Sequence, residues 1–227
     1  MKKLSVNVLA LILALAAPYS VAQDIAPDTL LKGVTMEVID IIGHDQDIQA
    51  GDPAKVAALV ESKILPHFDF AHMTQIAVAR NWWLTTAEQK KNLTAEFRTL
   101  LVRTYSATLS NYSGQAVEFK RLRTAPGDTE VTVKSVVRQP GTESLNMDYE
   151  MEKLTAGWKV FDIKIDGISL ITSYRETFAG KIRELGVDGL IKALADKNRQ
   201  NAVRFQARSM ENLLAPAIVQ SLLLGGR

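Results

Sequence analysis

Two histidines and an aspartate lie close together in the chain, at His67, Asp69 and His72. Imidazole and carboxylate groups are common zinc ligands, so these three side chains are the first candidates for a metal site. Their spacing matches no standard zinc motif, and Asp69 stands where a helix is expected to begin. An aspartate at that position caps a helix by accepting from its first backbone N–H groups. The spacing favours this structural role, and we predict no metal site.

A second pair of candidate groups is Asp162 and Asp166. Two neighbouring carboxylates can divide general acid and general base work between them. Apolar residues alternate with them at Phe161, Ile163 and Ile165, which indicates a strand whose polar side chains face solvent. A solvent-facing strand edge is therefore the alternative to an active site.

Other catalytic motifs are missing from the sequence. It contains no G-x-S-x-G nucleophile elbow, no phosphate-binding P-loop and no H-E-x-x-H zinc motif. It also has no cysteine, which excludes thiol enzymes, disulfide frameworks, iron–sulfur clusters and Cys-ligated zinc. We therefore predict no catalytic residue and no cofactor, and we do not expect an enzyme.

The overall composition is that of a folded protein with balanced charge. The chain has 227 residues, with 27 Lys and Arg against 25 Asp and Glu, and 47% of its residues are hydrophobic. A dedicated nucleic-acid-binding protein usually carries a strong basic excess, and a disordered chain has fewer apolar residues. The length suits one domain with a substantial core.

Residues 1–22 have the features of a secretory signal peptide. Lys2 and Lys3 precede an apolar stretch, and small residues end at Ala22, where we expect cleavage before Gln23. An uncleaved amino-terminal anchor is the alternative. Cleavage removes two lysines and no acidic residue, which leaves the mature chain formally neutral. An exported chain of this kind is expected in a bacterial periplasm.

Apolar residues at helical spacing predict four helices in the first half of the chain. The expected ranges are 27–43, 53–65 after an Asp52-Pro53 start signal, a short helix through Met73 and Ala77, and 86–112. Thr86 and Gln89 form a capping box at the start of the last helix.

The pattern then changes to alternation of apolar and polar residues, which predicts strands. Four strands are expected, at 115–124, 130–139, 144–154 and 158–166, joined by short turns. Short connections between consecutive strands are typical of an antiparallel meander.

Helices follow the strands again, at 168–185 and 187–197 with Gly186 between them. We therefore predict an α+β fold in which amino-terminal and carboxy-terminal helices cover a four-stranded antiparallel meander. The expected organisation is a signal peptide (1–22), one α+β domain (23–200) and a tail (201–227). The tail is either a helix kinked at Pro216 or a frayed end.

One face of the predicted sheet is strongly apolar. Its members are Val131, Val133, Leu145, Met147, Tyr149 and Met151. This face is compatible with an ordinary filled core. It is also compatible with a cavity, because methionine side chains form flexible, polarizable walls that suit a variable apolar ligand. Periodicity does not distinguish the two.

Several spaced segments resemble one known family. They are Gly157 to Leu170 (GWKVFDIKIDGISL) followed by Tyr174, Arg175 and Phe178; Phe68-Asp69-Phe70 through Met73; Trp82, Glu88-Gln89 and Phe97; and Gly186 to Ile191 (GVDGLI). In this order they resemble the MlaC/toluene-tolerance family over about residues 25–198. Ala79 departs from the glycine that the family usually has before its tryptophan segment.

The resemblance implies a function without covalent chemistry. Members of this family are periplasmic phospholipid-binding components of the Mla lipid transport system. They carry lipid between an outer-membrane lipoprotein complex and an inner-membrane ABC transporter complex, and thereby maintain outer-membrane lipid asymmetry. Contact with membrane complexes is transient, phospholipid is the cargo, and no nucleic acid is involved.

The resemblance also implies a hydrophobic cavity between sheet and helices, and we expect ten residues to line it. They are Val133, Met147, Tyr149 and Met151 from the sheet, Leu101 and Tyr105 from the long helix, Met73 and Ile76 from the short one, and Ile171 and Tyr174 after the sheet. Arg175 is expected either to approach the lipid phosphate or to pair with a neighbouring carboxylate.

Two other functions remain open from the sequence. One is an exported enzyme that acts on a hydrophobic substrate, with Asp162 and Asp166 as acid and base. The other is a periplasmic chaperone or interaction module with a filled core.

Overall fold

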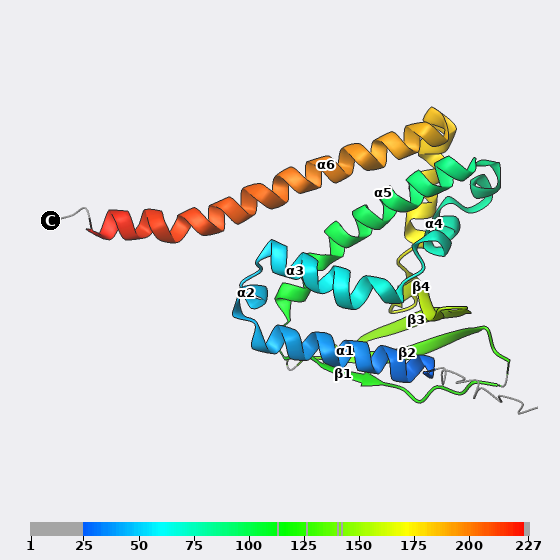
Figure 1. The fold of residues 1–227 in the computed structure, drawn as a ribbon, viewed down its shortest axis with the longest axis horizontal. Coiled ribbons are helices and arrows are strands. Elements are labelled where there is room, and N and C mark those ends of the chain that lie inside the picture. Colours follow the sequence, from blue (N-terminus) through cyan, green and yellow to red (C-terminus); the bar gives the residue numbers. More distant parts are fainter. Residues whose placement is uncertain (1–24, 113, 126, 140, 142, 225–227) are drawn as a thin grey trace, which may run out of the picture.

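The computed structural model describes residues 25–112, 114–125, 127–139, 141 and 143–224, with the side chains of 107, 110, 111 and 204–224 left undescribed. The predicted signal peptide at 1–22 lies outside this part. Helices form one side of the molecule and an antiparallel sheet forms the other (Figure 1). No helix among the described residues is long and apolar enough to cross a bilayer.

The helices begin and end at the following residues: α1 Pro27–His44, α2 Gln46–Gln49, α3 Pro53–Leu59, α4 Phe70–Val78, α5 Ala87–Tyr105 and α6 Arg175–Leu224. A π turn (Val60–Ile64) and a 3-10 turn (Leu65–His67) extend α3, and further 3-10 turns occupy Ala79–Leu84, Ser106–Asn111 and Thr172–Tyr174. The strands are β1 Ala116–Phe119, β2 Glu130–Arg138, β3 Leu145–Leu154, β4 Gly157–Ile165 and β5 Ile168–Ser169.

Side-chain caps confirm the predicted helix starts. Asp52 accepts from the Lys55 N–H and precedes Pro53 at the first position of α3. The capping box of α5 is complete, because Thr86 Oγ1 accepts from the Gln89 N–H at 3.1 Å and Gln89 Oε1 accepts from the Thr86 N–H at 3.0 Å. Each such cap stabilises a helix by about 1 kcal/mol.

The long helix is shorter than predicted. It was expected to continue to Tyr112, but α5 ends at Tyr105 and a 3-10 turn follows. Hydroxyl groups in its last turn donate to carbonyls one turn earlier: Thr104 to Leu100 at 2.7 Å and Ser106 to Val102 at 2.5 Å. Bonds of this kind compete with the regular ladder and favour bending or tightening of a helix.

The sheet is antiparallel with the strand order β1-β2-β3-β4-β5, which confirms the predicted meander. The expected count of four strands was wrong, because a short β5 forms where a helix was predicted to begin. Asp166 (φ 47°) and Gly167 (φ 83°) make a tight reversal, and Ile168 then pairs with Ile165 on β4. This turn depends on backbone conformations that apolar periodicity does not report.

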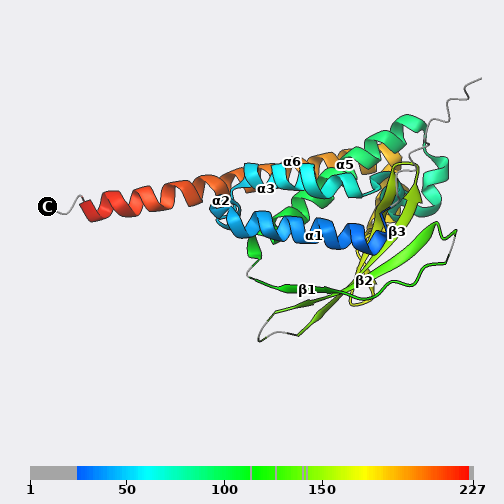
Figure 2. The same cartoon turned by 60° about the horizontal axis from the view of Figure 1, so that its bottom comes forward.

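Gly186 interrupts α6 as predicted, with φ 73° and ψ 179° inside an otherwise helical element. Beyond it, the helical backbone continues through Pro216 to Leu224. Both ribbon views show this distal part of α6 extending away from the other elements (Figures 1 and 2).

The buried apolar residues form three clusters. The sheet cluster contains Leu31, Val133, Met151, Trp158 and Val160. The helical cluster brings together α4, α5, the turn before α6, and α6, and the amino-terminal cluster joins α1 to α3. Figure 2 shows α1 between the sheet and the layer of α3, α5 and α6. Phe68 packs against both the sheet cluster and the helical cluster, so it connects the two layers.

Candidate functional site

The apolar face of the sheet is the strongest candidate for a functional surface. Met151 of β3 pairs with Val160 of β4, Val133 of β2 lies diagonally across from Met151, and all three are fully buried. Leu31 from α1 is buried against them, and Phe119 of β1 packs at the margin. This end of the face is closed by α1.

Burial decreases along β3 away from α1. Met151 is 0% exposed, Tyr149 and Met147 are half-buried, and Leu145 is 37% exposed. The register pairs these four residues with Val131, Val133, Ser135 and Val137 of β2. We call the part of the face formed by Met147, Tyr149, Ser135 and Val137 the open strip. Met147, Tyr149 and Val137 are partly exposed there, and the smaller Ser135 is buried between them. An apolar surface that continues beyond its cover is suited to bind an apolar ligand.

The opposite face of the sheet is polar. Glu150 accepts from Thr132 Oγ1 at 2.8 Å and from Lys164 Nζ at 2.7 Å. The bond to Glu150 holds the pKa of Lys164 above its usual range. Lys134 and Asp148 form a further ion pair at 3.3 Å. These side chains form hydrogen bonds and ion pairs with one another, so they do not need a ligand as a partner. The sheet is therefore amphipathic, with one apolar and one polar face.

Two hydroxyl groups lie within the apolar face. Ser135 is 1% exposed, and its Oγ has no hydrogen-bond partner within the described structure. The Tyr149 ring stacks against Phe119 with ring centroids 6.3 Å apart, and its hydroxyl contacts Met147 Sδ at 3.8 Å. Burial raises the pKa of the Tyr149 hydroxyl, and Ser135 opposes this rise in part. Tyr149 therefore remains a protonated donor at neutral pH.

The Asp162 carboxylate is buried and bonded to neighbouring protein groups, which indicates a structural role. It was expected at a solvent-facing edge, but this is wrong, because Asp162 is 5% exposed. Its carboxylate accepts from Ser169 Oγ at 2.5 Å, from the Ile163 N–H at 2.8 Å and from the Ile171 N–H at 3.2 Å. These bonds fasten β5 and the turn after it to β4.

Asp166 belongs to a different group of hydrogen bonds. It accepts from the backbone N–H and the side-chain amide of Asn146, at 3.0 and 3.1 Å. These two bonds hold its pKa below the usual range. Because Asp162 and Asp166 are engaged with separate partners, nothing in their geometry supports an acid–base pair.

The histidine segment is also structural. Asp69 Oδ1 accepts from the His72 N–H at 2.9 Å and caps α4, as predicted. His72 Nδ1 lies 2.7 Å from Glu152 Oε1, and its ring stacks on Phe161 at 4.4 Å. Burial lowers the pKa of His67. Among the described residues, no group of three or more His, Cys, Asp or Glu side chains is arranged to hold a metal ion.

The ten predicted lining residues divide between two layers. Val133, Tyr149 and Met151 belong to the sheet cluster, and Met147 lies next to them on the open strip. The helical cluster contains the buried residues Met73, Leu101 and Ile171, with Ile76 and Tyr174 packed against it. Tyr105 is 40% exposed and lies outside that core. The burial of Tyr174 raises the pKa of its hydroxyl, and the neighbouring Tyr105 raises it further.

Arg175 lies at the start of α6 and is exposed. Its Nε and Nη2 donate to the Ile76 carbonyl at 3.2 and 3.1 Å. The guanidinium therefore connects α6 to α4, rather than pairing with a carboxylate.

Several residues of the sheet face were not predicted from the sequence. They are Leu30 and Leu31 of α1, Phe68, Phe119, Ser135, Trp158 and Val160. Apolar spacing predicted the helix that contains Leu30 and Leu31, but it did not show which layer the apolar side of this helix would cover.

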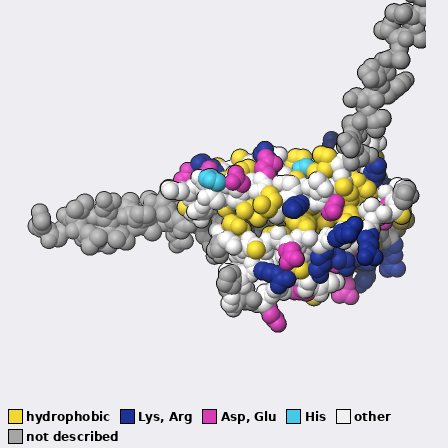
Figure 3. All heavy atoms as spheres, turned by 90° about the horizontal axis from the view of Figure 1, so that it is seen from below, with side chains coloured by type: hydrophobic (Ala, Val, Ile, Leu, Met, Phe, Trp, Pro, Cys, Tyr) yellow, Lys and Arg dark blue, Asp and Glu magenta, His cyan; other side chains and the backbone are white. Residues whose placement is uncertain are grey.

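Basic residues gather on the surface near β1. Lys120, Arg121 and Arg123 follow that strand and are exposed, and Leu122 between them packs against the sheet cluster. Within the described residues none of the three has an ion pair. Figure 3 shows Lys and Arg side chains concentrated at one side of the face seen from below, beside apolar ones.

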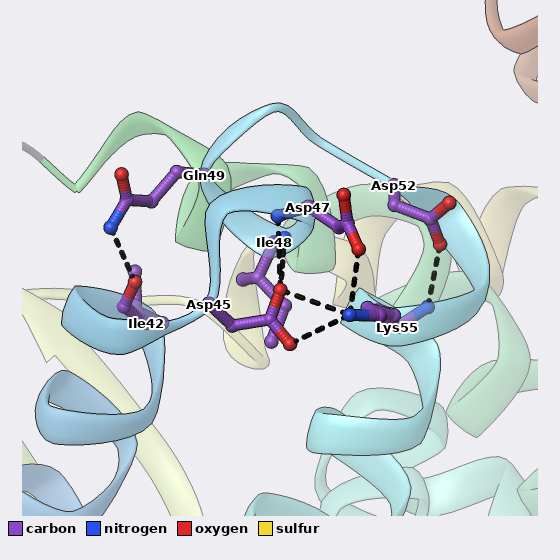
Figure 4. Close-up of polar contacts among 7 residues, drawn as sticks. All are labelled: Ile42, Asp45, Asp47, Ile48, Gln49, Asp52 and Lys55. Carbon is purple, nitrogen blue, oxygen red and sulfur yellow. Dashed lines mark hydrogen bonds and ion pairs between the residues drawn. The ribbon is translucent and has the colours of Figure 1, made fainter.

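A hollow of about 270 Å³ lies away from the sheet, between α1 and α3. Lys55 Nζ at its rim lies 3.0 Å from Asp45 Oδ2 and 2.7 Å from Asp47 Oδ2 (Figure 4). The Lys55 bond is the main reason that the pKa of Asp45 is low, and the two carboxylates raise the pKa of Lys55. These charges are matched within the chain, so the hollow is a junction of helices and not part of the sheet site.

Comparison with known proteins identifies the family. A model of the MlaC protein family matches residues 32–196. The chain belongs to the MlaC family. The match includes all ten predicted lining residues and Arg175, and it agrees with the resemblance expected from the sequence.

Two similar proteins extend this finding. The intermembrane phospholipid transport system binding protein MlaC of Haemophilus influenzae is 20% identical over 178 residues, which cover 77% of this chain and 83% of that protein. The phospholipid-binding protein of Ralstonia solanacearum, solved in complex with a phospholipid, is 40% identical, and its structure superimposes with a TM-score of 0.71. That similarity covers 77% of this chain and 98% of the other.

Proposed function

We propose that this protein binds and transports phospholipid. The observation that carries the proposal is the apolar sheet face, which is closed by α1 at Met151 and becomes exposed toward Leu145. The Ralstonia solanacearum protein of the same fold holds a phospholipid, which supports this assignment.

The physical demand of a lipid matches such a surface. Each CH₂ group removed from water contributes about 0.8 kcal/mol, so an acyl chain favours any site that covers it. A carrier must also release its cargo. A strip that is covered at one end and accessible at the other provides binding without complete enclosure.

We place the acyl chains along Val133, Met151, Tyr149 and Met147. The helical residues line the same cavity when the two layers separate near Phe68, which packs on both. These residues are Met73, Ile76, Leu101, Tyr105, Ile171 and Tyr174. We propose that Arg175 contacts the lipid headgroup, as expected from the sequence. The basic segment Lys120 to Arg123 is a second cationic surface that could bind a phosphate.

We propose that the signal peptide directs the chain to the periplasm and is cleaved after Ala22. There the protein carries lipid between an outer-membrane lipoprotein complex and an inner-membrane ABC transporter complex of the Mla system. The Haemophilus influenzae relative is the binding protein of an intermembrane phospholipid transport system, which supports this role. The proposal needs no enzyme activity and no cofactor, since phospholipid is the cargo.

A vesicle extraction experiment tests the proposal. Lipid-free protein is mixed with phospholipid vesicles, the vesicles are removed by centrifugation, and lipid in the supernatant is quantified against protein. We expect a fixed ratio of phospholipid to protein that saturates with added vesicles. A supernatant without lipid would instead favour a chaperone or interaction module with a filled core.

A further inference from the structure

Ser135 presents an unsatisfied hydroxyl group in an apolar place. It is 1% exposed and its Oγ has no hydrogen-bond partner among the described residues. Its neighbours across the strands are Phe119 of β1 and Met147 of β3, and Val133 precedes it on the same face. Buried hydroxyls in native proteins are nearly always hydrogen-bonded, so this one requires an explanation.

Tyr149 places a second hydroxyl on the same strip. Its contact is Met147 Sδ at 3.8 Å, and a thioether sulfur is a weak acceptor. The ring is held in position by stacking on Phe119. The Ser135 hydroxyl lies close enough to the Tyr149 hydroxyl to lower its pKa in part, so the two groups form a pair. Two hydroxyls that bond to each other use only one of their two donors, so at least one O–H on the apolar face has no strong acceptor from the protein.

The surroundings define the acceptor that would fit. The residues next to Ser135 on this face carry no charge, so a phosphate or an ammonium group would be buried there without a counter-ion. An uncharged oxygen attached to long apolar chains satisfies both hydroxyls and fills the strip at the same time. The ester carbonyls of a diacyl lipid are acceptors of this type.

We propose that Ser135 and Tyr149 donate hydrogen bonds to the ester carbonyl oxygens of the bound lipid and thereby fix its position along the open strip. This inference rests on the proposed function. It adds that the site recognises the ester linkage, in addition to the acyl chains.

The test compares ester-linked with ether-linked phospholipids. Lipid-free protein is offered vesicles that contain equal amounts of a diacyl phospholipid and the dialkyl ether lipid with the same headgroup and chain length. The lipids captured are then extracted and counted by mass spectrometry. Ether lipids lack the carbonyl oxygens, so the ratio of the two captured lipids reports the proposed bonds directly.

We expect the wild-type protein to prefer the ester lipid. A hydrogen bond of ordinary strength corresponds to roughly a two- to tenfold preference for each hydroxyl. Ser135→Ala and Tyr149→Phe should each reduce the preference, and the double variant should capture both lipids equally. Thr132→Val is the matched control, since it removes a hydroxyl of the same strand that bonds to Glu150 on the opposite face.

Thermal unfolding of the lipid-free variants checks that they fold. Ser135→Ala should be at least as stable as the wild type, because it removes a hydroxyl that has no partner. Equal capture of both lipids by the wild type, or an unchanged preference in the double variant, would overturn the inference while the proposed function stands. Failure of the wild type to capture either lipid would count against the proposed function itself.

Discussion

Asp162 shows how a carboxylate with catalytic potential is used for structure. Its oxygens accept from one hydroxyl and two backbone N–H groups, and all three donors belong to β4, β5 or the turn that follows. Three donors from the protein engage this carboxylate, and its side chain is buried, so it is not presented to a substrate. Its role is to hold the turn that leads from the sheet into the helical layer.

Replacement of Asp162 tests this role. We expect Asp162→Asn to lower the free energy of unfolding by about 1–3 kcal/mol, because the amide loses charge-assisted acceptor capacity at a buried site. Urea unfolding measures the change, and lipid capture per folded molecule should persist. A variant with wild-type stability that loses a chemical turnover would restore the enzyme hypothesis.

Two exposed carboxylates make the free energy of unfolding depend on pH in the acidic range. The side chain of Lys55 chiefly lowers the pKa of Asp45, and the backbone of Asn146 chiefly lowers that of Asp166, both from the ordinary value of 3.8. Each group is therefore ionised more readily in the folded state than in the unfolded state. Their contribution is present above about pH 4 and is lost as the pH falls through the folded pKa values.

The corresponding experiment is urea unfolding as a function of pH. We expect the midpoint to decrease below about pH 4, and Asp166→Asn to make the decrease shallower. Glu143→Gln, which changes an exposed acidic residue in the connection between β2 and β3, serves as the control. A midpoint that does not change on acidification would contradict the linkage.

At the scale of elements, the relation between α1 and β3 defines the site. Leu31 of α1 closes the face at Met151, and the strand then extends beyond the helix until Leu145 is exposed. The same alternating strand therefore supplies both part of the core and a binding surface. A small displacement of α1 would change how much of the strip is accessible.

A charge on the open strip should block binding. We expect Met147→Lys to reduce lipid capture at least tenfold, because an ammonium group there must remain hydrated and excludes an acyl chain. Since Met147 is only half-buried, the fold should survive, which circular dichroism can verify. Leu154→Lys, at the other end of β3 where Leu154 is 39% exposed, is the matched control. Equal loss of capture in both variants would contradict the placement of the site.

The elements were predictable from the sequence where neighbouring residues determine them. The Asp52-Pro53 start, the capping box at Thr86 and Gln89, and the break at Gly186 depend on local hydrogen bonds or backbone freedom, and all were found. The short β5 was missed because it depends on a reversal at Asp166 and Gly167 that then pairs with β4.

At the scale of the whole molecule, alternation along β3 did not reveal how burial varies. Leu145 and Met151 have equivalent places in the pattern, yet one is 37% exposed and the other fully buried. The difference arises from which helix covers which end, and that depends on packing between distant segments. The family resemblance predicted a sheet–helix cavity, but it did not show that the expected lining divides into two clusters that meet at Phe68.

The two layers have a consequence for transport. A carrier with a single rigid core would have to disrupt that core to accept an acyl chain. Under the proposed function, we expect the two layers to move apart while each cluster stays largely intact. We expect the sheet to keep its structure during such a change, because Thr132 and Lys164 both donate to Glu150 on its polar face.

The central claim is that this protein carries phospholipid in its native state. Native mass spectrometry of the mature protein, purified without detergent from the periplasm of cells that express the full chain, tests it most directly. The account predicts a mass above that of the polypeptide by one or a few phospholipids, which a solvent extract then identifies. A bare polypeptide mass together with a lipid-free extract would contradict it.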